Sequence, residues 1–226
     1  MIEILILISI LTCVEKYCTR RRKDIYATVR KWANSKINIE IRSVTEIDNK
    51  IYVFVKENNT AILKYPKFNI ETTAYIGKNG VTNEKREGDG KTPLGEFELG
   101  VMLGTHLNIK NANGITYKTL TKDMYWVDDS KSKYYNQLVN ISEVKKDWNS
   151  AEHLIDYPIQ YEYLIEIKTN PNNVPNKGSA IFLHCTNNKA TEGCIAVNKE
   201  TMKKLVENIN QQTKIEICKI NRLFEL

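Results

Sequence analysis

The sequence has few cysteines, no long apolar run and no nucleic-acid-binding signature, and these absences narrow what the chain can be. Its five cysteines are an odd number without regular spacing, which excludes a disulfide framework but does not fix the redox compartment. The net charge of +6 is spread along the chain without an RNA-binding or helix-turn-helix pattern, so we predict a lysine-rich solvated surface and no nucleic-acid partner.

The amounts of apolar and charged residues that are present suit a soluble globular protein. A chain of 226 residues with 42% hydrophobic and 27% charged residues can bury a sizeable core. The length fits one ordinary domain with an extension, or at most two small domains. No internal repeat or low-complexity segment interrupts the sequence.

The first 24 residues form an apolar and basic segment. Residues 4–14 are apolar over about the length of a signal-peptide core, which is too short to span a bilayer. Glu3 precedes this run without any Lys or Arg, and a basic cluster follows it at residues 20–23, where the positive-inside tendency would keep it in the cytoplasm. We interpret residues 1–24 as a candidate signal or anchor that could bring the protein to a membrane.

Short β-strands dominate the rest of the predicted structure. Residues 25–47 are expected to form a lead-in helix over 25–34 and an alternating strand over 36–44. In the domain that follows, over residues 48–220, apolar alternation and turn residues predict strands over 51–55, 61–65, 70–76, 95–99, 161–168, 180–184 and 213–220. One clear helix is predicted over 199–209, whereas residues 104–149 are polar and predicted irregular. The fold class is therefore mainly β.

A histidine and a cysteine near the end of the chain suggest nucleophilic chemistry. His184 ends an apolar strand, and Cys194 follows Gly193 ten residues later. A neighbouring imidazole can take the thiol proton, and the turn through Thr191 and Gly193 could present backbone N–H groups to an oxyanion. Because alternate strand residues share a face, Cys185 is expected on the opposite face, in the core.

Three other interpretations of these residues stand beside the catalytic one. Cys194 could be a small buried hydrophobe, the common state of a free cysteine, and His184 a hydrogen-bonded histidine at the edge of the core. Zinc could be bound by His184, Cys185, Cys194 and His153, but the spacing matches no closed zinc site and adjacent ligands would point to opposite faces. We predict no metal.

Taken together, the motifs resemble those of the YkuD-type L,D-transpeptidases, in the branch with a Thr-x-Gly-Cys signature. Thr191, Gly193 and Cys194 match the cysteine motif, and His184 matches the histidine upstream of it. The loop over residues 88–97 matches at Gly90, Lys91, Thr92, Pro93, Gly95 and Phe97, and residues 125–129, 134–136 and 152–154 also look like this branch. The resemblance covers about residues 51–217. Glu192 and Ala196 depart from the commoner motif, which affects substrate contacts more than the nucleophile.

The resemblance implies a fold, a reaction and a place of action. The fold would be an L,D-transpeptidase-like mixed β-sandwich with a few short helices. Cys194 would attack a peptidoglycan stem peptide to form a thioester, with His184 as the base and a nearby backbone carbonyl, such as that of Cys185, orienting the imidazole. An acceptor amine would give a cross-link and water a carboxypeptidase reaction, in neither case with a cofactor. A wall substrate implies an extracytoplasmic location, whereas a catalytically inactive wall-binding module is the alternative from another class.

Five further residues are candidates for substrate binding. Asp128 and Asp129 could meet a cationic group on the stem or could simply be solvated, and Trp126 could belong to the core. His106 is expected at the surface. The substrate-binding candidates are Trp126, Asp129, Tyr135, Asn136 and His153.

Overall fold

The computed structural model describes residues 49–107, 109 and 114–219. The predicted N-terminal segment, the helix over 25–34, the strand over 36–44 and the last residue of the strand over 213–220 lie outside these residues. The described residues, from Asn49 to Lys219, belong to one compact unit. No helix in the described part is long and apolar enough to cross a membrane.

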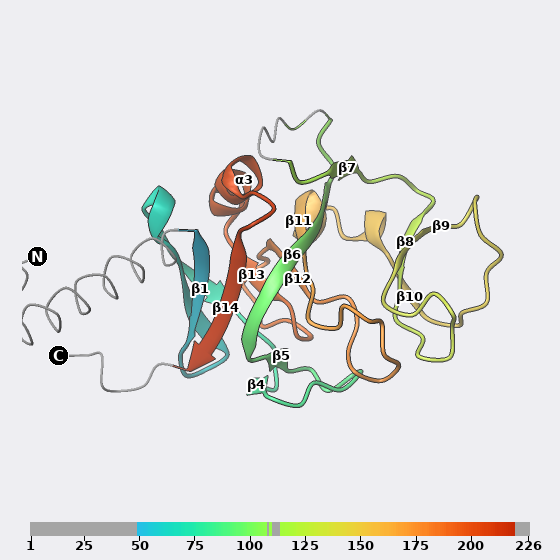
Figure 1. Cartoon of the computed structure of the whole chain (residues 1–226), viewed down its shortest axis with the longest axis horizontal. Coiled ribbons are helices and arrows are strands. Elements are labelled where there is room, and N and C mark those ends of the chain that lie inside the picture. The colour runs from blue at the N-terminus through green and yellow to red at the C-terminus, as the bar shows by residue number, and fades with distance from the viewer. Residues whose placement is uncertain (1–48, 108, 110–113, 220–226) are drawn as a thin grey trace, which may run out of the picture. The chain divides into compact units, whose positions relative to one another are not determined.

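A single mixed sheet of nine strands forms the body of the domain (Figure 1). The strand order is β11-β12-β13-β3-β2-β1-β14-β6-β7, and β6 also pairs with β11, so that eight of the strands close into a ring. These strands are β1 (Lys50–Val55), β2 (Thr60–Tyr65), β3 (Ile70–Tyr75), β6 (Gly95–Gly104), β7 (Tyr117–Thr119), β11 (Tyr163–Ile167), β12 (Phe182–Cys185), β13 (Ile195–Val197) and β14 (Lys214–Lys219). The mainly β fold predicted from the sequence is confirmed.

The main core lies between the inward faces of these strands and one helix. Strand β2 alternates between half-buried and buried residues, as expected for a strand with one face in a core. Helix α3 (Lys199–Asn208) matches the helix predicted over 199–209, and it buries Met202, Leu205 and Val206 fully in this core. Its first turn is capped by the Asn198 side chain, which accepts a hydrogen bond of 2.8 Å from the Thr201 backbone N–H.

The middle of the chain is more regular than the sequence predicted. It contains β7 and a separate three-stranded sheet of β8 (Met124–Val127), β9 (Leu138–Asn140) and β10 (Ala151–His153), in the order β10-β8-β9. The prediction of an irregular segment over 104–149 is therefore wrong. These strands have three or four residues each, which is too short for an alternating pattern to stand out among polar residues.

The remaining elements are short connections. A two-stranded parallel sheet joins β4 (Val81–Thr82) to β5 (Thr92–Pro93), below the main sheet in Figure 1. Three 3₁₀ turns occur among the described residues: η2 (Pro66–Phe68), η3 (Leu154–Asp156) and η4 (Gln160–Glu162).

Strand β12 is covered on both faces, and this positions the candidate site. Leu183 and Cys185 point into the main core, whereas Phe182 points into a second cluster, which also holds Trp126 and Cys194. Cys185 is 2% exposed, as expected for the core residue that strand alternation indicated. Because β8 contributes Trp126 to the second cluster, the small sheet and the main sheet meet beside Cys194.

Candidate active site

The pairing of β12 with β13 puts Cys194 and His184 on the same face of the sheet. The two strands are parallel, with His184 opposite Ala196. Cys194 precedes Ala196 by two residues, and residues two apart in an extended chain share a face. The thiol and the imidazole therefore lie toward the same side, next to the second cluster.

The Cys194 thiol is buried and held by backbone groups. Its Sγ donates a hydrogen bond to the Ala180 carbonyl oxygen at 3.2 Å, and the Phe182 N–H donates to Sγ at 3.3 Å. The residue is 8% exposed. Burial raises the pKa of the Cys194 thiol to about 12, since a thiolate loses solvation in this setting. In this arrangement the Cys194 side chain is a neutral thiol whose hydrogen bond goes to a carbonyl and not to the imidazole.

His184 is also buried and neutral. Its Nδ1 lies 2.8 Å from the carbonyl oxygen of Cys185, the kind of acceptor that the resemblance implied. A carbonyl only accepts, so Nδ1 carries the hydrogen and Nε2 keeps a free lone pair. Burial lowers the pKa of His184 to about 4. The ring is therefore in the tautomer that a general base requires.

The turn before Cys194 is locked by hydroxyl groups. Thr191 Oγ1 donates to the Cys194 carbonyl at 2.7 Å and accepts from the Gly193 N–H at 3.2 Å. The Gly193 N–H is thus engaged within the turn and is not free for an oxyanion. Gly193 has φ of +141°, and a Cβ there would lie 2.9 Å from the Lys91 carbonyl oxygen. Only glycine fits this position without strain.

Thr92 is a site residue whose role the sequence did not show. It is fully buried in β5, and its Oγ1 accepts from the Gly77 N–H and donates to the Gly193 carbonyl, both at 2.8 Å. The sequence indicated Thr92 only as a member of the loop motif over residues 88–97. The spacing of that motif does not reveal that one hydroxyl connects two distant turns.

Lys85 is a second residue that the sequence did not single out. Its side chain is 9% exposed and forms an ion pair with Asp89. A Cβ on Gly193 would lie 3.1 Å from the Lys85 ammonium, so the cation sits against the cysteine turn. Its positive charge lowers the pKa of Cys194, against the larger effect of burial.

Tyr161 and Glu152 complete the surroundings of the imidazole. The Tyr161 ring meets the His184 ring edge-on, with centroids 5.6 Å apart, and the Tyr161 hydroxyl donates a hydrogen bond to Glu152. Glu152 belongs to β10, so the small sheet delivers a carboxylate next to the candidate catalytic pair. In the sequence, Glu152 stands out only as part of the motif over residues 152–154, and Tyr161 does not stand out.

Trp126 and Asn136 support the wall behind the thiol. Trp126 is 3% exposed, packs edge-on against Phe182 with centroids 4.9 Å apart, and donates from Nε1 to the Asn136 side-chain oxygen at 3.1 Å. The same Asn136 oxygen accepts from the Ala180 N–H at 3.1 Å. Asn136 therefore fixes the residue whose carbonyl binds the Cys194 thiol.

Two of the other three substrate-binding candidates form hydrogen bonds within the protein. Tyr135 is 2% exposed and donates its hydroxyl to Glu87. Asp129 accepts hydrogen bonds from the backbone N–H groups of Asn149 at 2.8 Å and Lys131 at 2.9 Å. These hydrogen bonds stabilise loops, and the five candidates do not meet at one place.

His153 and His106 have partners as well. Nδ1 of His153 lies 3.0 Å from Asp156 and Nε2 lies 2.7 Å from the Lys122 carbonyl, so both ring nitrogens are occupied. The half-buried His106 bonds Glu162 at 2.8 Å and stacks on Tyr163. The His106 side chain is 41% exposed, in agreement with the surface position predicted for it.

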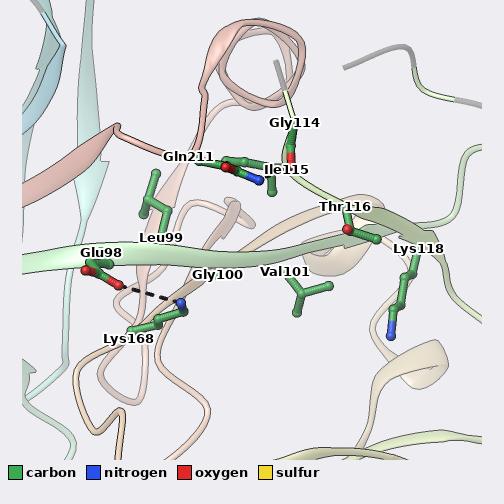
Figure 2. A pocket seen from close by; sticks show the side chains of 10 residues that line it. All are labelled: Glu98, Leu99, Gly100, Val101, Gly114, Ile115, Thr116, Lys118, Lys168 and Gln211. Carbon is green, nitrogen blue, oxygen red and sulfur yellow. Dashed lines mark hydrogen bonds and ion pairs between the residues drawn. The ribbon is translucent and has the colours of Figure 1, made fainter. Parts of the chain in front are cut away.

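Two hollows flank β6, and neither is lined by Cys194 or His184. Figure 2 shows the first, of about 520 Å³, where Lys168 and Glu98 form an ion pair. The second, of about 450 Å³, is lined partly by Trp126 and Asn136. It thus brings two of the predicted substrate-binding residues to one open space.

Among the described residues, no group of three or more His, Cys, Asp or Glu side chains is arranged to hold a metal ion. Cys185 packs in the main core and Cys194 in the second cluster, which separates two of the four residues considered for zinc.

Comparisons with known proteins identify the family. A search of curated proteins found no match. A crystal structure of Mycobacterium tuberculosis L,D-transpeptidase 1 is similar over 74% of this chain and 61% of that chain, at 12% identity and a TM-score of 0.32. The chain thus spans less than two thirds of that protein. The sequence model of the YkuD family, the L,D-transpeptidase catalytic domain, matches residues 41–217. This match covers most of the chain, which therefore belongs to the YkuD family of L,D-transpeptidase catalytic domains.

Proposed function

We propose that the protein is a peptidoglycan L,D-transpeptidase in which Cys194 is the nucleophile and His184 the general base. The observation that carries the proposal is the shared face of the two residues, with the His184 Nδ1 hydrogen engaged by the Cys185 carbonyl and the Nε2 lone pair left available. Both groups are neutral at rest, so the thiol proton moves to Nε2 as sulfur attacks.

The reaction proceeds in two acyl transfers. Sulfur forms a bond to the carbonyl carbon of the third stem residue, and the bond to the terminal D-amino acid breaks as the imidazolium protonates the departing amine. An acceptor amine then attacks the thioester, gives its proton to His184, and the proton returns to the sulfur as it leaves. Before the first step the thiol must turn from the Ala180 carbonyl toward the imidazole.

The acceptor distinguishes cross-linking from hydrolysis. Incubation of the purified protein with disaccharide tetrapeptides, followed by mass spectrometry, is expected to give cross-linked dimers. Tripeptides without dimers would instead assign the protein as an L,D-carboxypeptidase on the same scaffold.

A carbapenem tests the nucleophile itself and the alternative of a catalytically inactive wall-binding module. The wild-type protein is expected to gain the mass of the drug, whereas the Cys194→Ala variant is not. Cys185→Ala is the matched control, because Cys185 is an equally buried thiol in the main core, and it should still be labelled. Labelling of the Cys194→Ala variant would refute the assignment.

The proposed location is the cell envelope, reached through the apolar segment over residues 4–14. A wall substrate and a segment of signal-core length support this proposal. Cell fractionation with an antibody against the domain should find the protein in the membrane or wall fraction. Recovery only from the cytosol would contradict it.

A further inference from the structure

Tyr161 connects a carboxylate to the candidate catalytic pair. It is 5% exposed, its ring contacts the His184 ring edge-on, and its hydroxyl donates to Glu152. Glu152 comes from β10 and Tyr161 from η4, so two separate segments converge on the imidazole. Tyr161 is therefore held on one side by packing against the His184 ring and on the other by its hydrogen bond to Glu152.

The charges around Glu152 are of one sign. Asp128, at the end of β8, and Glu87, in the loop before β5, both disfavour its ionisation, and Tyr161 is its hydrogen-bond donor. Burial is the largest effect and raises the pKa of Glu152 to about 7. Tyr157, from the segment after η3, also faces this charge. Lys85, whose charge acts on Cys194, is paired with Asp89.

One oxygen in this group has no donor. Oδ1 of Asp128 is buried, and no residue in the described part of the chain donates a hydrogen bond to it. Glu87, in contrast, accepts hydrogen bonds from Tyr135 and from Ser179. Buried acceptors are rarely left unpaired in proteins, so an unpaired oxygen beside Glu152 indicates a place for an incoming donor.

A charged Glu152 opposes the proposed chemistry. After burial, the Glu152 carboxylate is the next largest influence that raises the pKa of Cys194. Attack requires the sulfur to become negative close to this carboxylate, which costs free energy in a poorly solvated site. A positive group that neutralises Glu152 would remove this cost.

We propose that Glu152, held by Tyr161, is a specificity-determining residue that receives a primary ammonium group of the acyl-donor peptide and so permits Cys194 to ionise. The inference rests on the proposed function, in which the carbonyl of the third stem residue lies at Cys194. A diamino acid at that position carries a side-chain ammonium, which is the group that we propose Glu152 receives. The nucleophile then becomes reactive chiefly when a cationic substrate is bound.

Alkylation of the thiol tests the electrostatic part without any substrate. Iodoacetamide modification of Cys194 at pH 8, followed by peptide mass spectrometry, is expected to be about tenfold faster in Glu152→Gln than in wild type, since one pKa unit is a factor of ten in thiolate. Glu192→Gln is the matched control, because Glu192 is an exposed carboxylate beside the same cysteine that is paired with Lys78, and it should change the rate little. An unchanged rate in Glu152→Gln would overturn the proposal.

Binding to an inactive protein tests the ligand. Cys194→Ala protein should bind a tetrapeptide with lysine at the third position at least about tenfold more tightly than the same peptide with its lysine acetylated, by calorimetry. Adding Glu152→Gln should abolish this preference, whereas adding Glu192→Gln should keep it. Equal affinity for the two peptides with Glu152 intact would refute the ammonium assignment.

Two further results separate this inference from the proposed function. Tyr161→Phe keeps the ring on His184 but removes the hydroxyl, and it should weaken the preference for the unacetylated peptide even if Glu152→Gln does not fold. If the preference survives Tyr161→Phe unchanged, Tyr161 has no part in recognition and the proposal is wrong in that respect. Failure to form dimers or tripeptides refutes the reaction, whereas the alkylation and binding results concern Glu152 alone.

Discussion

At the scale of single residues, the hydroxyl of Thr92 joins segments that are far apart in the sequence. It accepts from the Gly77 N–H and donates to the Gly193 carbonyl, one residue before Cys194. A buried backbone donor or carbonyl that loses its partner costs about 1–3 kcal/mol. The orientation of the cysteine turn therefore depends on a side chain from the loop before β6.

Thr92→Val should lower the free energy of unfolding by about 1–3 kcal/mol, because valine keeps the volume but leaves the Gly77 N–H unpaired. Urea denaturation measures this. Thr116→Val is the control, since Thr116 is exposed and its side chain forms no hydrogen bond among the described residues. An equal loss of unfolding free energy in the two variants would show that the Thr92 hydroxyl stabilises the protein no more than an exposed threonine does.

His184 predicts a dependence of stability on pH. Its pKa is about 4 in the folded protein and 6.5 ordinarily, so between these values the unfolded chain binds a proton that the folded chain does not. The contribution of His184 to stability is complete above pH 6.5 and falls by about 3 kcal/mol as the pH drops to 4. The difference in unfolding free energy between wild type and His184→Gln should therefore shrink from pH 7 to pH 4.5. The same shrinkage in His106→Gln would argue against this origin.

At the scale of elements, α3 shows why some segments are predictable from sequence. Its buried residues recur at helical spacing, and Asn198 stands directly before it as a cap. Apolar residues at helical spacing and a capping residue are both local signals, so together they predict a helix without knowledge of the rest of the fold. The hairpin strands β1 and β2 carry similar local signals, with two asparagines at positive φ in the turn between them.

Asn198→Ala should cost about 1 kcal/mol of stability, because the Thr201 N–H loses its acceptor. Asn198→Asp retains an acceptor and places a negative charge at the helix N-terminus, so it should remain near the wild-type value. Thermal unfolding followed by circular dichroism checks both. A loss in Asn198→Asp as large as that in Asn198→Ala would point instead to the bond that Asn198 donates to Thr72.

Some features of the site could not be predicted from the sequence, among them strands β8 and β10 and the residues that surround His184. Histidine, cysteine and glycine motifs indicated the face of β12 and the turn before β13, because chain neighbours determine them. Tyr161, Glu152 and Lys85 come to the surroundings of His184 and Cys194 only through tertiary packing of short segments. Spacing along the chain carries no information about such convergence, and no strand was predicted over residues 151–153, the segment that supplies Glu152.

At the scale of the whole molecule, closure of the sheet depends on the pairing of β6 with β11. Gly104 pairs with Tyr163 across this join and with Thr119 of β7. A Cβ at Gly104 would lie 2.4 Å from the Glu162 carbonyl oxygen and 2.6 Å from the Tyr117 hydroxyl. The absence of a side chain is therefore required where three strands meet.

Gly104→Ala should destabilise the domain by about 1–3 kcal/mol, because the added methyl group forces these strands apart. Gly80→Ala is a suitable comparison, since nothing lies within 4 Å of a Cβ there and only its positive φ opposes the change. Chemical denaturation of both variants measures the difference. A larger loss in Gly80→Ala would show that the crowding at Gly104 is relieved elsewhere.

The directions of the strands also determine how the domain can be attached to a surface. Strand β13 runs antiparallel to β3, and β3 runs in the same direction as β1 because β2 separates them in an antiparallel arrangement. Cys194 thus lies at the edge where β1 ends at Val55 and β14 ends at Lys219, opposite the edge where the chain enters at Lys50. Within the domain, an attachment at Lys50 and an attachment at Lys219 would therefore lie at opposite edges, and only the attachment at Lys219 would share the edge of Cys194.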